Sequence, residues 1–235
     1  MDPIGIFPGK VAHQGHNVKQ DLAAWLANAD FKRIQDAFAQ SSRTLSALIA
    51  FTYSENDLVC WRAIDAVGRI AERHCSARPS VFRNYLQRLF WMMSDEAGIV
   101  APHAPEIIGE IVRSDAMAFG EYIPLTVSLL KLEPEDLPLF LPGILYALWR
   151  IGQVAPIASE EAFQGIESAL RSKDPRARAM AVRCLSLHGF REVLLRHPEL
   201  ADDREKVRIY REGGLYNTSI DRLYRKLSPR MGTKV

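Results

Sequence analysis

The densest group of polar side chains in an otherwise apolar stretch lies between residues 95 and 106. Asp95 and Glu96 are followed by His103 and Glu106, and the last two are three positions apart. On a helix this spacing places an imidazole and a carboxylate on one face, where they could act as an acid–base pair or hold a metal. However, Asp95 and Glu96 are also common turn and cap residues. The sequence favours a structural role for this group and keeps all four residues as candidate contacts to a partner.

Two Trp-Arg pairs form a second group of candidate binding residues. Trp61-Arg62 and Trp149-Arg150 each lie in a segment that ends in glycine. Aromatic and guanidinium side chains together could stack on a nucleobase or hold a peptide. Alternatively, the two tryptophans fill the core between neighbouring helices. Both interpretations stay open at the level of sequence.

The remaining reactive side chains are poorly organised for catalysis. His13 and His16 have no nearby residues to complete a tetrahedral metal site, and neither Cys60 nor His74-Cys75 is better placed. No nucleophile elbow, phosphate-binding glycine loop or dinucleotide-binding fingerprint is present. We therefore expect no catalytic residues, no metal and no cofactor, and the sequence favours a protein without enzymatic activity.

The elements that must position these side chains follow a repeat. Similar segments end at Gly68, Gly109, Gly152 and Gly189, roughly every 40 residues. Five positions before each glycine stands a small residue: Ala63, Ala104, Ala147 or Cys184. Small residues let neighbouring helices approach closely. Between these segments apolar residues recur at helical spacing, so the pattern predicts antiparallel helix pairs stacked as an α-solenoid.

The two ends of the chain differ from the repeats. Residues 1–40 predict an N-terminal arm and capping helices, with Asn17 and Asp30 as helix caps, whereas residues 41–197 form the solenoid. Residues 198–235 predict a C-terminal extension that packs on the solenoid.

Strand-like alternation at the start of this extension indicates a β-hairpin. The stretch Val207-Arg208-Ile209-Tyr210 alternates, and Glu212-Gly213-Gly214 supplies the turn before a second strand and a short helix. A single hairpin is marginally stable alone, so we expect it to lie against the last helices.

A family resemblance is carried by the strings LSALIAFTYSENDLVCWRAIDAVGRIAE and ESALRSKDPRARAMAVRCLSLHG. They resemble HEAT and HEAT-like repeats, over roughly Ser41 to Gly189, and the turn that begins at Asp174-Pro175 matches best. The segment MMSDEAGIVAPHAPEIIGEIV is also similar to bacterial HEAT-like proteins of unknown activity, although Pro102 and Pro105 depart from an ordinary second helix and leave its register open. The resemblance implies an all-α fold, an α-α solenoid of about four helix pairs, here with a small C-terminal β-hairpin plus helix.

The same resemblance invites comparison with two enzyme classes. Iron-dependent hydroxylases built on HEAT-like repeats use repeated His-Glu pairs, but none of the six histidines here precedes glutamate. DNA glycosylases built on HEAT-like repeats hold DNA in a basic concavity with Trp, Asp and Arg side chains. Residues 90–170 hold 12 acidic side chains against three basic ones, which would repel DNA.

Composition limits the partners and the location. The 235 residues carry a net charge of +2, although 16 basic and 8 acidic residues follow from Arg171 onward. Three cysteines without close spacing fit a reducing cytoplasm. The longest apolar stretch, Leu137 to Trp149, is too short for a membrane span.

These observations favour a cytoplasmic, non-enzymatic HEAT-like scaffold that binds another protein on its concave face. The alternative is a nucleic-acid-binding or DNA-repair protein of the glycosylase type that uses the basic C-terminal part.

Overall fold

A computed structural model describes residues 18–93, 101–133, 135–157, 159–187 and 190–227. In this part of the chain almost all regular structure is helical, and the two strands form one antiparallel sheet. The elements are, in order, α1 (Val18–Ala27), α2 (Phe31–Gln40), α3 (Arg43–Phe51), α4 (Asp57–His74), α5 (Pro79–Met92), α6 (Ala104–Ser114), α7 (Tyr122–Ser128), η2 (Leu129–Lys131), α8 (Leu137–Gly152), α9 (Glu160–Ala169), α10 (Pro175–Leu185), α11 (Arg191–Leu195), η3 (Pro198–Asp202), β1 (Lys206–Arg211), β2 (Gly214–Ser219) and α12 (Ile220–Leu227).

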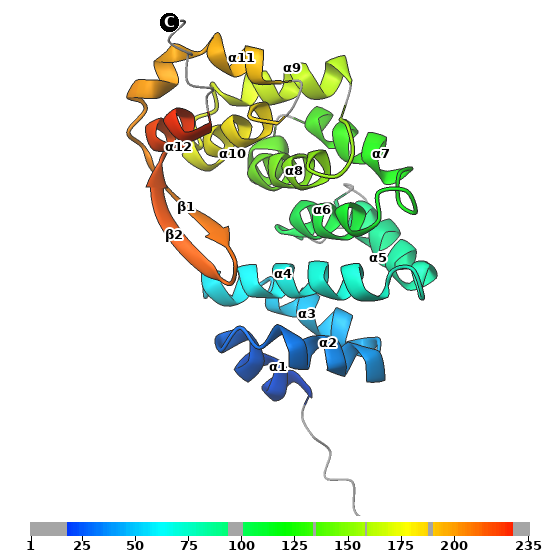
Figure 1. The fold of residues 1–235 in the computed structure, drawn as a ribbon. Coiled ribbons are helices and arrows are strands. Elements are labelled where there is room, and N and C mark those ends of the chain that lie inside the picture. Colours follow the sequence, from blue (N-terminus) through cyan, green and yellow to red (C-terminus); the bar gives the residue numbers. More distant parts are fainter. Residues whose placement is uncertain (1–17, 94–100, 134, 158, 188–189, 228–235) are drawn as a thin grey trace, which may run out of the picture.

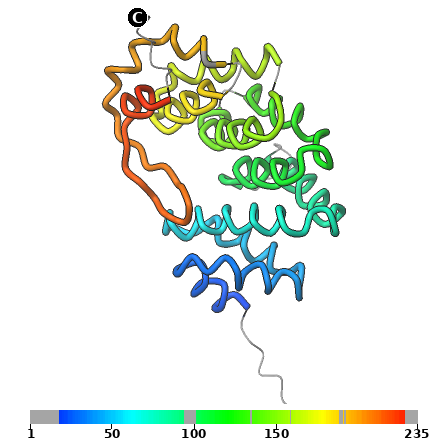
Figure 2. Tube along the Cα trace, viewed as in Figure 1, coloured from blue at the N-terminus to red at the C-terminus, as the bar shows by residue number. Residues whose placement is uncertain are grey.

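The helices stack as pairs in sequence order. Helices α4, α6, α8 and α10 are the second members of four successive pairs, and each contacts the next along the stack. Helices α1 and α2 pack on one another and on α4 at the blue end of the stack (Figure 1). The tube in Figure 2 follows the same order from blue to red. The predicted all-α fold, an α-α solenoid of about four helix pairs, is confirmed. The division into an N-terminal arm with capping helices, a solenoid and a C-terminal extension stays a prediction.

Side-chain caps fix where several helices begin. The Asn56 side chain accepts hydrogen bonds from the backbone N–H groups of Leu58 and Val59 at the start of α4. Asp30 caps α2 in the same way, as the sequence predicts. The other predicted cap, Asn17, lies outside the described residues.

Gly68 and Gly109 serve close packing inside α4 and α6, whereas α8 ends at Gly152, as the sequence predicts. A Cβ atom on Gly109 would lie 2.5 Å from Ala147 Cα, so this glycine lets α6 approach α8. A Cβ atom on Gly68 would overlap the carboxylate of Glu110. Both helices continue past these glycines, which corrects the expectation that Gly68 and Gly109 end their segments. Gly189 lies outside the described residues.

The predicted small residues are all in the core. Ala63, Ala104, Ala147 and Cys184 are at most 1% exposed. The Cys184 thiol donates a hydrogen bond to the Leu145 carbonyl of the neighbouring helix at 3.1 Å. Short side chains at these positions therefore bring the second helices together, because anything longer would hold them apart.

The β-hairpin forms where the alternation predicts it. Its two turn residues, Glu212 and Gly213, have φ values of 50° and 84°, as a tight two-residue hairpin loop requires. The sequence places the hairpin against the last helices, but it also runs back along the stack to α4 (Figure 1). At its tip, Arg62 Nε donates to the Gly213 carbonyl at 2.8 Å. Residues about 150 positions apart in sequence thus meet, which local pattern cannot predict.

Within the described residues, no helix combines the length and the hydrophobicity that crossing a membrane requires.

Candidate functional site

The hairpin encloses a cavity against the second helices, which we call the hairpin pocket. Its volume is about 670 Å³. Residues at the starts of three second helices line it, namely Asp57 on α4, His103 before α6, and Asp174 before α10. The facing wall comes from β1 and β2. Helix N-termini carry partial positive charge, so the backbone of these helices favours negative charge on this side.

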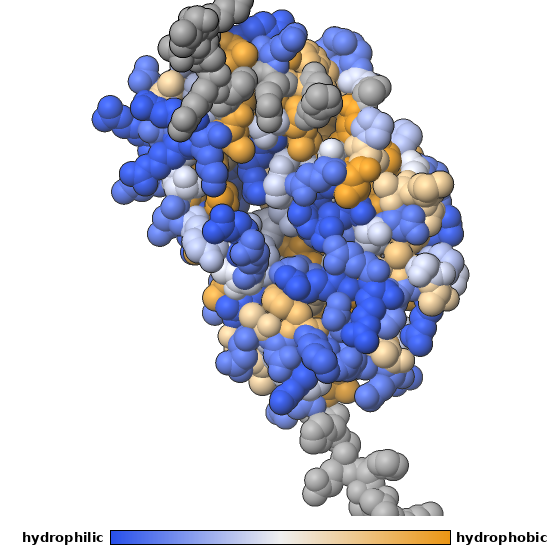
Figure 3. Space-filling model, in the orientation of Figure 1, coloured by the Kyte–Doolittle hydropathy of each residue, from blue (hydrophilic) through white to orange (hydrophobic). Residues whose placement is uncertain are grey.

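The outer surface above this region is mainly hydrophilic. In Figure 3, hydrophilic residues dominate the face, and the apolar atoms that are visible form separate groups. No single continuous apolar area dominates this view.

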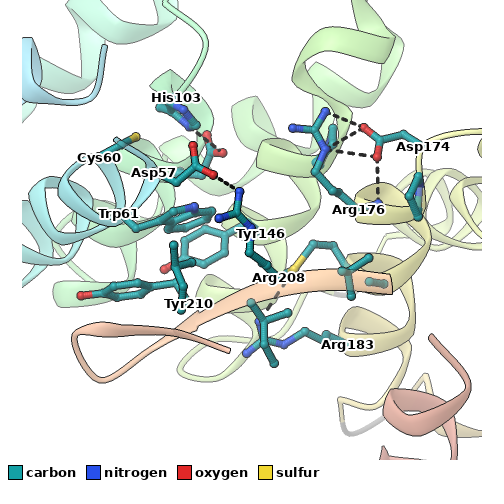
Figure 4. A pocket seen from close by; sticks show the side chains of 18 of the residues that line it. Asp57, Cys60, Trp61, His103, Tyr146, Asp174, Arg176, Arg183, Arg208 and Tyr210 are labelled. Atoms are coloured by element: carbon teal, nitrogen blue, oxygen red, sulfur yellow. Dashed lines mark hydrogen bonds and ion pairs between the residues drawn. The ribbon is translucent and has the colours of Figure 1, made fainter. Parts of the chain in front are cut away.

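Aromatic rings fill one side of the hairpin pocket. The Trp61 ring stacks on Tyr210 of β1, with centroids 5.7 Å apart and planes 12° apart. Its centroid lies 5.1 Å from that of Tyr146 on α8 and 6.3 Å from that of His103. Trp61 therefore joins α4, the hairpin and α8 in one aromatic cluster (Figure 4).

His103 and Glu106 lie side by side, as their spacing predicts, and they form an ion pair. His103 Nδ1 lies 3.1 Å from Glu106 Oε1, and both side chains line the pocket. Burial lowers the pKa of His103, but hydrogen bonds with Cys60 and Glu106, together with the Glu106 charge, outweigh it and raise the pKa to about 10. The imidazole is therefore protonated at neutral pH, and it cannot act there as a general base.

Glu106 keeps one oxygen unpaired in this arrangement. The residue is 5% exposed, and its Oε2 atom has no hydrogen-bond partner among the described residues. A Cβ atom on Gly143 of α8 would overlap this carboxylate, so the glycine makes room for it. The pair is thus held by close packing between α6 and α8.

Three polar contacts tie the hairpin to α4. Arg208 on β1 forms an ion pair with Asp57, and the Tyr210 hydroxyl donates to Asp65 Oδ2 at 2.7 Å. Together with the Arg62 contact at the hairpin tip, these bonds hold the hairpin over the second helices. Arg62 Nη1 also donates to two carbonyls at the end of α1, so its role here is structural.

A second buried carboxylate lies beneath the aromatic cluster. Glu110 is 2% exposed and accepts hydrogen bonds from Arg150 Nε at 2.7 Å, Arg113 Nε at 2.7 Å and the Tyr146 hydroxyl at 2.6 Å. Burial raises the pKa of Glu110, but the two guanidinium groups outweigh it and hold the pKa below its usual range. Glu110 therefore remains ionised and cross-links α6 to α8.

The cations of the hairpin pocket differ in how they are paired. Arg176 is bound to Asp174 at 2.8 Å, and Arg208 is bound to Asp57. By contrast, neither Arg183 nor Lys206 has a carboxylate partner among the described residues, although both line the pocket. Four lysine and arginine side chains and the protonated His103 face three carboxylates there, which leaves an excess of positive charge.

The structure brings three of the predicted site residues together. Trp61, His103 and Glu106 line the hairpin pocket. Arg62 and Arg150 lie nearby but are bound within the fold, and Trp149 lies under Arg183 and does not line the pocket. Asp95 and Glu96 lie outside the described residues. Partner binding by all eight residues stays a prediction.

Sequence reasoning missed the contribution of Tyr146, Arg183, Arg208 and Tyr210. A signal for two of them was present, because Arg208 and Tyr210 are two positions apart on a strand and so share a face. For Tyr146 and Arg183 no local pattern distinguishes a pocket residue from a residue on an outer helix face.

Comparison with known proteins gives few matches. No family model matches the chain. Over 85 residues it is 35% identical to a protein of Archaeoglobus fulgidus described as an "Uncharacterized protein", which covers 36% of this chain and 43% of that protein. The chain thus matches less than half the length of this relative.

A solved structure matches this chain over most of its length, with low identity and a low TM-score. It is the crystal structure of an archaeal HEAT-like repeats protein from Thermococcus onnurineus, with 16% sequence identity and a TM-score of 0.36, over 89% of this chain and 95% of that one. The matched proteins are archaeal, so the expected similarity to bacterial HEAT-like proteins is not borne out.

Proposed function

We propose that this protein is a non-enzymatic helical-repeat scaffold that binds a segment of a partner protein in the hairpin pocket. The observation that carries the proposal is the cavity of about 670 Å³ between the hairpin and the second helices. Pockets that hold ligands typically measure about 300–1,000 Å³. Such a volume suits a few side chains of an inserted segment, whereas a folded domain would have to stay outside.

The chemistry of the walls supports binding in preference to catalysis. Aromatic rings and arginines are the side chains that dominate binding energy at interfaces, and Trp61, Tyr146 and Arg183 all line this pocket. His103 lies against Glu106, and its raised pKa keeps the imidazole protonated at neutral pH. The pocket therefore offers recognition groups without a free general base.

Two neighbouring positions on β2 allow a matched test. Asn217 is exposed and lines the pocket, whereas Tyr216 is exposed and does not. Adjacent strand residues point to opposite faces, so Asn217→Trp would fill the pocket and Tyr216→Trp would leave it open. Partner capture from nuclease-treated native lysate should be lost with Asn217→Trp and retained with Tyr216→Trp. Equal capture by both variants would place the binding surface elsewhere.

A nucleic-acid-binding function is the second candidate, and the unpaired cations Arg183 and Lys206 favour it. Neutralising six phosphates would give a slope of about −5 for log affinity against log salt concentration. We expect only weak duplex binding, because the hairpin covers the second helices and the middle repeats are acidic. Tight DNA binding at physiological salt, measured by fluorescence anisotropy and weakened by Lys206→Ala, would favour nucleic acid over a protein partner.

A further inference from the structure

Arg183 differs from Arg176 and Arg208 of the hairpin pocket, because no acidic side chain among the described residues pairs with it. Its Cζ atom lies 3.5 Å from the centroid of the Trp149 ring, so the guanidinium is stacked on the indole face. Its Nη1 atom donates a long hydrogen bond to the Met180 sulfur at 3.8 Å. Among the described residues, no carboxylate pairs with this guanidinium, whereas Arg150, Arg176 and Arg208 each have one.

Stacking prepares the guanidinium for a planar anion. An arginine that lies flat on an aromatic ring keeps its N–H donors in the ring-parallel plane, where they match the two oxygens of a carboxylate. The indole also restricts the side-chain rotamers, so less conformational entropy is lost when an anion binds. Arg183 is thus held in a geometry that a bidentate acceptor could use.

The burial and the charge of Arg183 also favour the binding of an anion. Burial lowers its pKa to about 10, and nearby Arg150 contributes in the same direction. The side chain nevertheless remains charged at neutral pH, so this partly buried charge has no compensating charge among the residues that the structure describes. Binding an anion would remove this imbalance.

Lys206 supplies a second unpaired cation to the same cavity. It is exposed at the start of β1, lines the hairpin pocket, and has no ion pair among the described residues. Apolar side chains of Met180 and Leu215 line the pocket as well. The combination suits a ligand that carries a negative group next to an apolar one.

We propose that Arg183 and Lys206 bind the carboxylate of an acidic side chain in the partner segment, with a neighbouring apolar side chain against Met180 and Leu215. This inference rests on the proposed function, since it specifies the segment that the hairpin pocket accepts. A carboxylate on a protein is favoured over the phosphates of nucleic acid because the hairpin lies across the second helices and the middle repeats are acidic.

The test uses the full chain and a matched pair of small probes. Blocked leucyl-glutamate and leucyl-glutamine dipeptides differ in charge but hardly in shape. They would be titrated to millimolar concentration while NMR follows the side-chain signals of Arg183 and Lys206. The glutamate probe should shift both signals, and it should bind at least about tenfold more tightly than the glutamine probe.

Variants distinguish bidentate recognition of the carboxylate by Arg183 from a general attraction between opposite charges. Arg183→Lys keeps the charge but loses the planar donor pair, and it should weaken the glutamate probe about tenfold. Lys206→Ala should weaken it as well, while Lys19→Ala, which removes an exposed lysine on α1, should leave it unchanged. Circular dichroism of each variant verifies that it folds.

The dipeptide titrations and the partner-capture experiment can fail independently of each other. Equal binding of both dipeptides, binding of neither, or tighter binding of thymidine monophosphate than of the glutamate probe would overturn the carboxylate site. If this happens while Asn217→Trp still abolishes partner capture, the anion inference is wrong and the scaffold function stands. If the glutamate probe binds as expected but capture survives Asn217→Trp, the pocket binds carboxylates and the partner binds elsewhere.

Discussion

Replacing Glu110 with glutamine should destabilise the solenoid strongly, although it changes a single atom. The carboxylate is 2% exposed and is bound by two arginines, whose side chains are 15% and 20% exposed for Arg113 and Arg150. Removing one member of a buried ion pair typically costs about 3–5 kcal/mol because the partner charge stays buried. For a chain of this size each kcal/mol lowers the melting temperature by about 2–4 °C, so we expect a fall on the order of 10 °C.

Thermal unfolding followed by circular dichroism measures this effect, and Glu121→Gln is the matched control. Glu121 also pairs with an arginine, Arg83 at 3.1 Å, but its side chain is 52% exposed. Exposed ion pairs contribute about 0–1 kcal/mol, so this control should lower the melting temperature by at most a few degrees. If the two variants lose the same small stability, the argument that Glu110 cross-links the second helices is wrong.

The pH dependence of the Glu110 effect is a second readout of the same experiment. A carboxyl whose folded pKa is lowered stabilises the fold at pH values above its unfolded pKa, which is about 4.3 for glutamate. The difference between wild type and Glu110→Gln should therefore be complete above about pH 5 and decrease as the pH falls through the folded pKa. If the stability difference between wild type and Glu110→Gln does not change with pH, it arises from the shape of the side chain and not from its charge.

Three further changes test the geometry of the hairpin pocket. In the folded protein the pKa of His103 is raised to about 10. The stability that His103 contributes relative to His103→Gln should therefore be complete below about pH 6.5 and decrease as the pH rises toward 10. Urea unfolding at a series of pH values measures this stability difference. Gly143→Ala should cost about 1–3 kcal/mol in the same assay, because its Cβ would overlap Glu106, and a neutral effect would contradict the packing. Tyr210→Phe removes the hydrogen bond to Asp65 and should cost about 0.5–1.5 kcal/mol, with faster hydrogen exchange in β1 and β2. Unchanged exchange would show that this bond does not hold the hairpin.

Much of the fold could be predicted from the sequence because it depends on local pattern. Asp30 as a cap and the buried positions of Ala147 and Cys184 follow from residue type and helical spacing. The hairpin is also visible locally, through its alternation and the turn at Glu212-Gly213. What local pattern cannot give is the direction in which the hairpin points, because this depends on contacts with residues about 150 positions away.

The site was harder to predict for the same reason. Trp61 and Trp149 look alike in sequence, but of the two Trp61 alone lines the hairpin pocket. The position of the hairpin decides which of these surfaces becomes a pocket. Arg150 resembles a free binding residue until Glu110, one repeat earlier, is placed beside it. Glu106 and Glu110 on the mostly apolar helix α6 were the available signal, because a buried carboxylate needs a cation or a close-fitting neighbour.

The central claim is that a partner segment occupies the hairpin pocket, and site-specific photo-crosslinking tests it most directly. A photoreactive phenylalanine analogue would replace Leu215, which lines the pocket, or the adjacent Tyr216, which does not. Crosslinking in cells, followed by mass spectrometry of the joined peptides, identifies what lies within reach of each position. We predict that Leu215 gives a specific crosslink to an acidic segment of one protein and that Tyr216 does not. Crosslinks of equal yield from both positions, or a crosslink to nucleic acid from Leu215, would contradict the account.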